Sequence, residues 1–190
     1  MLLARIHKEI QIVSQTSRNT PQDVCRVIAM AMLADNNMDD QEIAVLAEMK
    51  VHEKAGINPD EFRGAVHDLC KEILVNEDGT PNVSVTELGL ITKILPLLNR
   101  EAPMDMESVS HLVELVNRAD PTLLGESLLD GERLDATLDR IDDRRLQLWI
   151  GSMLVRMVHA DGEVHDNEKI LVSHVLNRWS IAPESLGVGN

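Results

Sequence analysis

An acidic stretch at residues 159–170 decides the fold that this sequence predicts. It reads HADGEVHDNEKI, with four acids and two histidines in its first ten positions. The segment that leads into it, 146–160, is almost wholly apolar, and the segment after it repeats apolar side chains at helical spacing. We therefore interpret the chain outward from one unit, an acidic loop between two apolar helices.

A similar unit occurs earlier in the chain, where residues 34–42 read ADNNMDDQE. The two copies align at an offset of 126 positions, with apolar residues matching on both sides. The paired acids are Asp35 with Asp161, Asp40 with Asp166, and Glu42 with Glu168. Because this period is too long for a solenoid, we expect a duplicated helical hairpin, with copies at about 21–56 and 146–180 packed about a pseudo-twofold axis. Such packing would bring both acidic loops to one end of the bundle.

The composition favours helices throughout. Hydrophobic residues make up 44% of the 190 positions, and they include nine Met and one Phe but no Tyr. Sheets are enriched in aromatic and β-branched residues, whereas Leu, Ala, Met and Glu favour helices. We predict one all-α domain over residues 1–190, a globular bundle of about eight or nine helices, in which further helices at 58–145 separate the two copies.

Capping signals locate most of these helices. Thr20-Pro21 predicts the start of a helix that is apolar nearly all round and central to the core, and Asn58-Pro59 repeats the signal. The clearest loop is 76–83, with Asp-Gly and Thr-Pro punctuation. The helices expected are 2–15, 21–34, 39–55, 58–75, 84–98, 106–117, a short piece at 120–124, 131–144, 146–160 and 166–179.

The net charge of −14 counts against nucleic acid and anionic membrane as partners, because both are bound through Lys and Arg. It suits cations or a basic partner protein. The longest apolar run, 27–34, is far short of the roughly 20 residues that span a bilayer. Cys25 and Cys70 form no ligand-spaced set, so we expect reduced, buried thiols and a cytoplasmic protein, with a disulfide as the alternative.

The acidic loops support two interpretations. Glu42 and Glu168 each stand three residues after a candidate N-cap, and the Asp-Gly pair at 161–162 suits a turn, so helix capping and turn formation account for several acids. Asp35 and Asp161, however, fall at the C-terminal ends of helices, where the dipole disfavours an anion by about 0.3–1 kcal/mol. A cation would compensate them. The candidate metal ligands are Asp35, Asp40, Glu42, Asp161, Glu163, Asp166 and Glu168.

A carboxylate-rich ligand set favours Ca²⁺ or Mg²⁺. His159, His165 and His174 make Zn²⁺ or Mn²⁺ the alternatives, although histidines on helix surfaces usually have structural roles. An EF-hand is excluded, because the sixth loop position counted from Asp161 is Asp166 rather than Gly. No motif for an organic cofactor is found.

The pattern A-D-x-x-[apolar]-x-D-x-E between apolar helices resembles the acidic motif of the tellurite-resistance TerB-like family. The resemblance is strongest at 147–179 and weaker at 24–56, where Asn36 stands at the family's usual Gly and Asn37 at the position of Glu163. It implies an all-helical fold and acidic residues that bind a divalent cation. It also implies a role in stress and metal or metalloid resistance through protein complexes rather than catalysis.

Two other functions remain open. The first is a metal-dependent phosphohydrolase of HD type, because His67-Asp68 on a helix, with His52 upstream, faintly resembles that family's metal-binding doublet. Cys70 departs from the family, which usually shows Gly there. The second is a purely structural helical protein that binds a partner. With no convincing catalytic constellation, we expect a non-enzyme that works with a protein partner, and a homodimer remains open.

Overall fold

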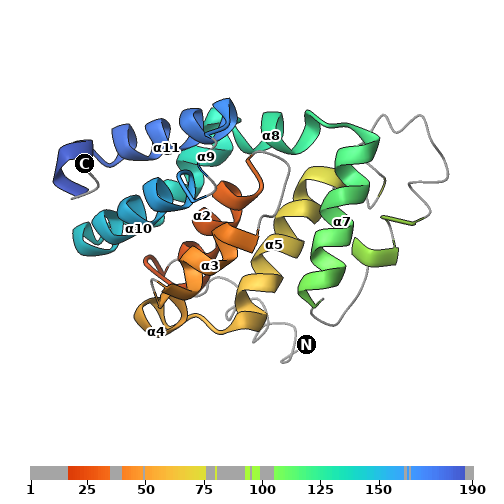
Figure 1. The fold of residues 1–190 in the computed structure, drawn as a ribbon, viewed down its shortest axis with the longest axis horizontal. Helices are drawn as coiled ribbons and strands as arrows, with labels where there is room; N and C mark the ends of the chain where they lie inside the picture. Colours follow the sequence, from red (N-terminus) through yellow and green to blue (C-terminus); the bar gives the residue numbers. More distant parts are fainter. Residues whose placement is uncertain are drawn as a thin grey trace, which may run out of the picture.

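The computed structural model describes residues 17–34, 40–48, 50–75, 80, 93–94, 96–98, 105–160, 162 and 164–186. The described part is built from α-helices, which confirms the predicted all-α bundle (Figure 1). They are α2 (Pro21–Met32), α3 (Asp40–Glu48), α4 (Val51–Ala55), α5 (Pro59–Leu74), α7 (Met106–Ala119), α8 (Leu123–Leu128), α9 (Gly131–Leu138), α10 (Arg144–Met157) and α11 (Asp166–Arg178), followed by the 3-10 helix η1 (Pro183–Leu186). The helix predicted at 2–15 lies outside the described residues, as do most of the loop at 76–83 and of the helix at 84–98.

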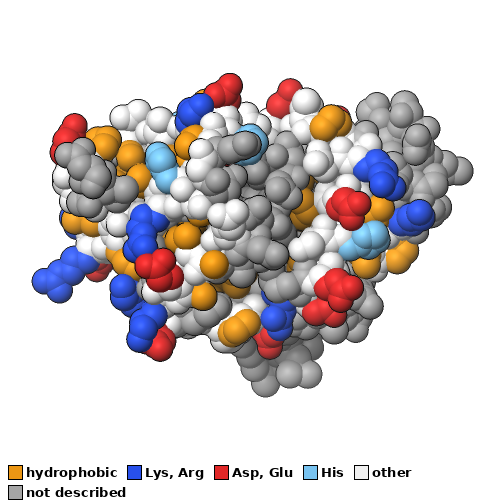
Figure 2. Space-filling view, in the orientation of Figure 1, with side chains coloured by type: hydrophobic (Ala, Val, Ile, Leu, Met, Phe, Trp, Pro, Cys, Tyr) orange, Lys and Arg blue, Asp and Glu red, His pale blue; other side chains and the backbone are white. Residues whose placement is uncertain are grey.

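Charged side chains of both signs are interspersed over the face of the molecule shown in Figure 2. The most apolar helix, α2, has only 12 residues. No helix in the described part of the chain combines the length and the apolar character needed to cross a membrane. Among the described residues, Ile170 is the one large hydrophobic side chain that is exposed.

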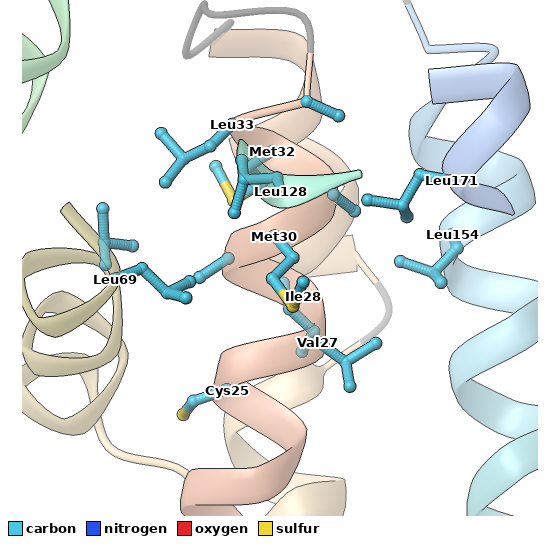
Figure 3. Packing of buried hydrophobic residues seen from close by; sticks show 14 of the residues in the cluster. Cys25, Val27, Ile28, Met30, Met32, Leu33, Leu69, Leu128, Leu154 and Leu171 are labelled. Carbon is cyan, nitrogen blue, oxygen red and sulfur yellow. The ribbon is translucent and has the colours of Figure 1, made fainter. Parts of the chain in front are cut away.

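Helix α2 is the centre of that core, as predicted. It packs against α5 on one side and against α10 and α11 on the other (Figure 1). Figure 3 shows Leu69 of α5 and Leu154 and Leu171 of α10 and α11 directed towards it from opposite sides. Helix α2 is apolar on nearly every face because other helices cover nearly every face.

The two cysteines belong to the same core. Cys25 on α2 and Cys70 on α5 are both free and fully buried, as expected from the sequence. Desolvation by burial raises the pKa of each thiol to about 12. At neutral pH both thiols are therefore protonated and behave as small hydrophobic side chains.

The capping signals in the sequence mark the helix starts correctly. Thr20 caps α2 in a reciprocal capping box with Asp23, and Asn58 caps α5 in the same way with Glu61. Asp105 caps α7 by accepting a hydrogen bond from the Ser108 backbone N–H at 2.8 Å. Each box satisfies backbone donors that the first helical turn leaves unpaired.

Three predicted helix boundaries are wrong. The helix expected at 39–55 is broken at Lys50, whose φ of 53° is left-handed, so that α3 and α4 are separate. The helix expected at 131–144 ends at Leu138, and α10 begins at Arg144 because Asp143 caps it with hydrogen bonds from the Arg145 and Leu146 N–H groups. The short piece expected at 120–124 is instead α8, at Leu123–Leu128.

The first and second helical copies begin side by side. Asn19, with a left-handed φ of 59°, precedes α2, and its side-chain amide donates to Asp142 Oδ1 at 2.7 Å. Its amide oxygen accepts from the backbone N–H groups of Asp142 and Asp143 at 2.8 and 3.0 Å. One side chain thereby ties the entry of α2 to the entry of α10.

Candidate functional site

Gly125 of α8 marks where the flanks of the two acidic loops meet. A Cβ atom built on Gly125 would collide with the side-chain amide of Asn167 and would lie 3.2 Å from the carbonyl oxygen of Ala34. Ala34 is the last described residue before the first acidic loop, and Asn167 is in the first turn of α11, directly after the second. Because α8 has no side chain there, both flanks pack onto its backbone.

Both loops therefore leave their helices at the same end of the bundle. The beginnings of α2 and α10 are tied together through Asn19, and the end of α2 lies beside the beginning of α11 at Gly125. Sequence reasoning missed Gly125 and Asn167, because a contact between segments so far apart in the chain has no local signal.

Five of the seven predicted ligands cannot be placed. Asp35, Asp161 and Glu163 lie outside the described residues. Asp40 and Glu42 are in the first turn of α3, and their side chains lie outside the described part as well. For these residues the metal site stays a prediction.

The two remaining acids have different environments. Glu168 is buried, with 5% of its surface exposed, and one of its carboxylate oxygens accepts the His165 backbone N–H at 2.8 Å. This is the capping contact predicted for it. Asp166 has a side chain 92% exposed and 3.0 Å from the ammonium group of Lys169. Glu168 is therefore fixed at the base of the second loop, whereas Asp166 faces solvent.

Two of the three histidines considered as alternative ligands have partners in the described part of the chain. His174 on α11 is 2.7 Å from Asp135 of α9, and this contact holds the pKa of the Asp135 carboxyl below its usual value, with the charge of Arg178 adding to the effect. His159 is exposed, with Nδ1 2.7 Å from the Val155 carbonyl oxygen in its own helical turn. Among the residues that the structure describes, no three His, Cys, Asp or Glu side chains are grouped as metal ligands would be.

The histidine of the phosphohydrolase alternative is used in packing. His67 Nε2 lies 3.1 Å from the carbonyl oxygen of Leu98, so the ring donates a hydrogen bond that joins α5 to the helical segment at 96–98. Its other nitrogen is 3.6 Å from Asp68, whose side chain is 70% exposed. The side chain of His52 lies outside the described residues. The described geometry gives His67 a structural role.

In comparisons with known proteins, no protein-family model, no curated protein and no solved structure matches this chain. The resemblance to the TerB-like family therefore rests on the residues of the acidic loops. The arrangement around Gly125 is the structural observation that bears on those loops.

Proposed function

We propose that this chain is a non-catalytic, TerB-like stress- or tellurite-resistance-associated protein that binds a divalent cation and presents a cation-responsive surface to a protein partner. The observation that carries the proposal is the meeting of the two loop flanks at Gly125. The start of the first carboxylate-rich stretch and the end of the second thereby lie at one place on the molecule.

The chemistry of the donors suits hard cations. Carboxylate oxygens are the ligands that Ca²⁺ and Mg²⁺ prefer in proteins. Asp35 and Asp161 have the strongest need of a cation, because each follows the C-terminal end of a helix, where the dipole is negative. Glu168 already has one oxygen in the α11 cap, so its expected contribution is to hold the second loop in place.

Binding of a cation would change the surface charge that a partner protein contacts. A protein with a net charge of −14 repels acidic surfaces. Neutralising carboxylates at one end of the bundle would lower that repulsion and order the two loops together. The same end is therefore where we expect the partner, or a second copy of the chain, to bind.

The test is calorimetric titration and thermal unfolding with Ca²⁺, Mg²⁺, Mn²⁺ and Zn²⁺, applied to the wild type, to D35N/D161N and to E132Q. Glu132 is an exposed acid on α9 that belongs to neither acidic loop, and it serves as the matched control. A cation present at 100 times its dissociation constant should stabilise the native state by about 2.7 kcal/mol. The wild type and E132Q should gain this stability, and D35N/D161N should lose it.

The proposal is wrong if no cation binds the wild type more tightly than D35N/D161N. Partner capture that persists in a chelator, together with an absence of cation binding, would support the purely structural alternative. Hydrolysis of generic phosphate esters with Mn²⁺ that is lost in H67A would support the phosphohydrolase.

A further inference from the structure

A second cleft lies away from the acidic loops, at the opposite end of α2. It has a volume of about 410 Å³, within the range of small-molecule sites, and lies between the residues around the start of α2, the end of α4 and the first two turns of α10. Val24, Leu146 and Trp149 supply its apolar lining. Lys54 and Arg145 supply its cations.

Both cations are without a partner among the described residues. Most arginines of this protein are neutralised: Arg156 by Glu48 at 2.7 Å, for example, and Arg178 by Asp139 at 2.6 Å. The side chains of Lys54 and Arg145 make no such contact within the described part. Arg145 also stands in the first turn of α10, where the helix dipole disfavours a cation. Lys54 and Arg145 therefore line one cleft without an ion-pair partner among the described residues.

Trp149 adds a hydrogen-bond donor that is also unused. Its indole Nε1 is buried and has no acceptor among the described residues. The other tryptophan, Trp179, donates its Nε1–H to the Leu138 carbonyl oxygen at 3.3 Å. Buried donors are normally paired, since an unpaired one loses its bond to water without replacement. Because this nitrogen is enclosed, a ligand in the cleft would meet the indole ring of Trp149 rather than its N–H.

We propose that this cleft binds a small organic carboxylate with an apolar body. A carboxylate has two acceptor oxygens and a single negative charge, which match the two cations of the cleft. The apolar body would pack on Trp149 and Leu146. A doubly charged phosphate fits less well, because Asp143 lines the same cleft and Asp142 is its chain neighbour.

Another cleft of the described molecule differs in this respect. It lies between α2, α5 and α9, has a volume of about 460 Å³, and is lined by Arg26, Arg133 and Arg140. Arg26 is paired with Glu72, and Arg140 with the buried Asp23. Two of its three arginines thus have a carboxylate partner, although Arg133 Nη1 is buried and unpaired within the described part of the chain. At the cleft beside Trp149 neither cation has such a partner among the described residues.

The two tryptophans provide the measurement. In a ¹H–¹⁵N correlation spectrum the side chains of Trp149 and Trp179 give two indole N–H cross-peaks, which W149F assigns. Titration with phenylacetate should move the Trp149 cross-peak saturably, with a dissociation constant of about 1 mM or tighter. The Trp179 cross-peak should stay in place and also reports that each variant is folded. Phenylacetamide, which keeps the apolar body without the charge, and inorganic phosphate, which lacks the body, should each bind about tenfold more weakly or not at all.

Charge-reversal variants distinguish binding at this cleft from a general effect of the protein's net charge. K54E and R145E should each weaken phenylacetate about tenfold, whereas K71E, a matched change at an exposed lysine of α5, should leave its affinity unchanged. The proposal is overturned if phenylacetate produces no saturable shift of the Trp149 cross-peak. Equal binding of phenylacetamide or phosphate, or an equal loss in K71E, would overturn it as well. None of these outcomes depends on a divalent cation.

Discussion

The first helices of the two copies, α2 and α10, align residue for residue, yet they occupy different environments. From Val27 to Ala34 every residue is buried in the first copy. In the second copy Ile150, Met153 and Leu154 are equally buried, but Trp149 and Val155 are only half-buried. One apolar pattern has become a central helix in one copy and a helix with an open face in the other.

Two aligned positions show where the copies diverge. Met30, which is fully buried, corresponds to Arg156, whose side chain is 40% exposed and bonded to Glu48. Leu33, also fully buried, corresponds to the exposed His159. The first copy is packed closely against α5, which belongs to the segment between the copies. A helical hairpin can thus be repeated with its core positions intact while its outer face adapts to whatever covers it.

The largest expected effect tests this difference directly. M30A should destabilise the protein by about 2–5 kcal/mol, because it removes buried atoms and leaves a cavity in a fully enclosed position. R156A, at the corresponding position of α10, should cost about 1 kcal/mol or less, as expected for an exposed ion pair. Urea unfolding of both variants measures the two free energies. Similar losses of unfolding free energy in M30A and R156A would show that α2 and α10 are packed alike, which would contradict the difference described between the two copies.

A smaller effect is expected where the copies touch. G125A places a methyl group against Asn167 and Ala34, and overpacking of this kind should cost about 1–3 kcal/mol. The matched control is G64A in α5, where a Cβ would meet nothing within 4 Å and should add about 0.4–1 kcal/mol of stability. Thermal unfolding should therefore shift in opposite directions. Partial recovery in G125A/N167A would assign the strain to Asn167, and a neutral G125A would argue against the meeting of the loop flanks.

The smallest effect concerns the ion pairs that join α11 to α9. The hydrogen bond from His174 and the charge of Arg178 lower the folded-state pKa of Asp135 below its ordinary value of 3.8. This carboxylate therefore contributes stability above about pH 3.8, and the contribution is lost as the pH falls through the folded-state pKa. The melting temperature of the wild type should exceed that of D135N at about pH 6, and the difference should disappear at lower pH. A constant difference for D135N would exclude titration of Asp135 as the cause.

Local chemistry explains which parts of the fold were predictable. The starts of α2 and α5 follow from Thr20-Pro21 and Asn58-Pro59, because an N-cap and a proline at the first helical position act within one turn. The central position of α2 follows from its apolar periodicity. The capping role of Glu168 also follows from its spacing to His165.

The errors arise where local chemistry gives no signal. Nothing marks Lys50 as left-handed, since lysine has no preference for that region. Leu138 ends α9 without a glycine or proline beside it. For the candidate site, the sequence predicts the acids of both loops, but the place where the loop flanks Ala34 and Asn167 meet depends on Gly125, which is far from both in the chain.

The left-handed residue at Lys50 also breaks the internal symmetry of the molecule. Its counterpart in the second copy, Leu176, continues the helix α11 without interruption. If α3 were equally continuous, Lys54 would lie about 9 Å beyond Glu48 along a straight axis, at 1.5 Å per residue. The turn instead directs α4 to the cleft at the start of α10, where Lys54 joins Arg145. A single backbone dihedral thus makes two similar hairpins differ in outline, and it brings Lys54 of the first hairpin to a cleft that the start of the second hairpin completes.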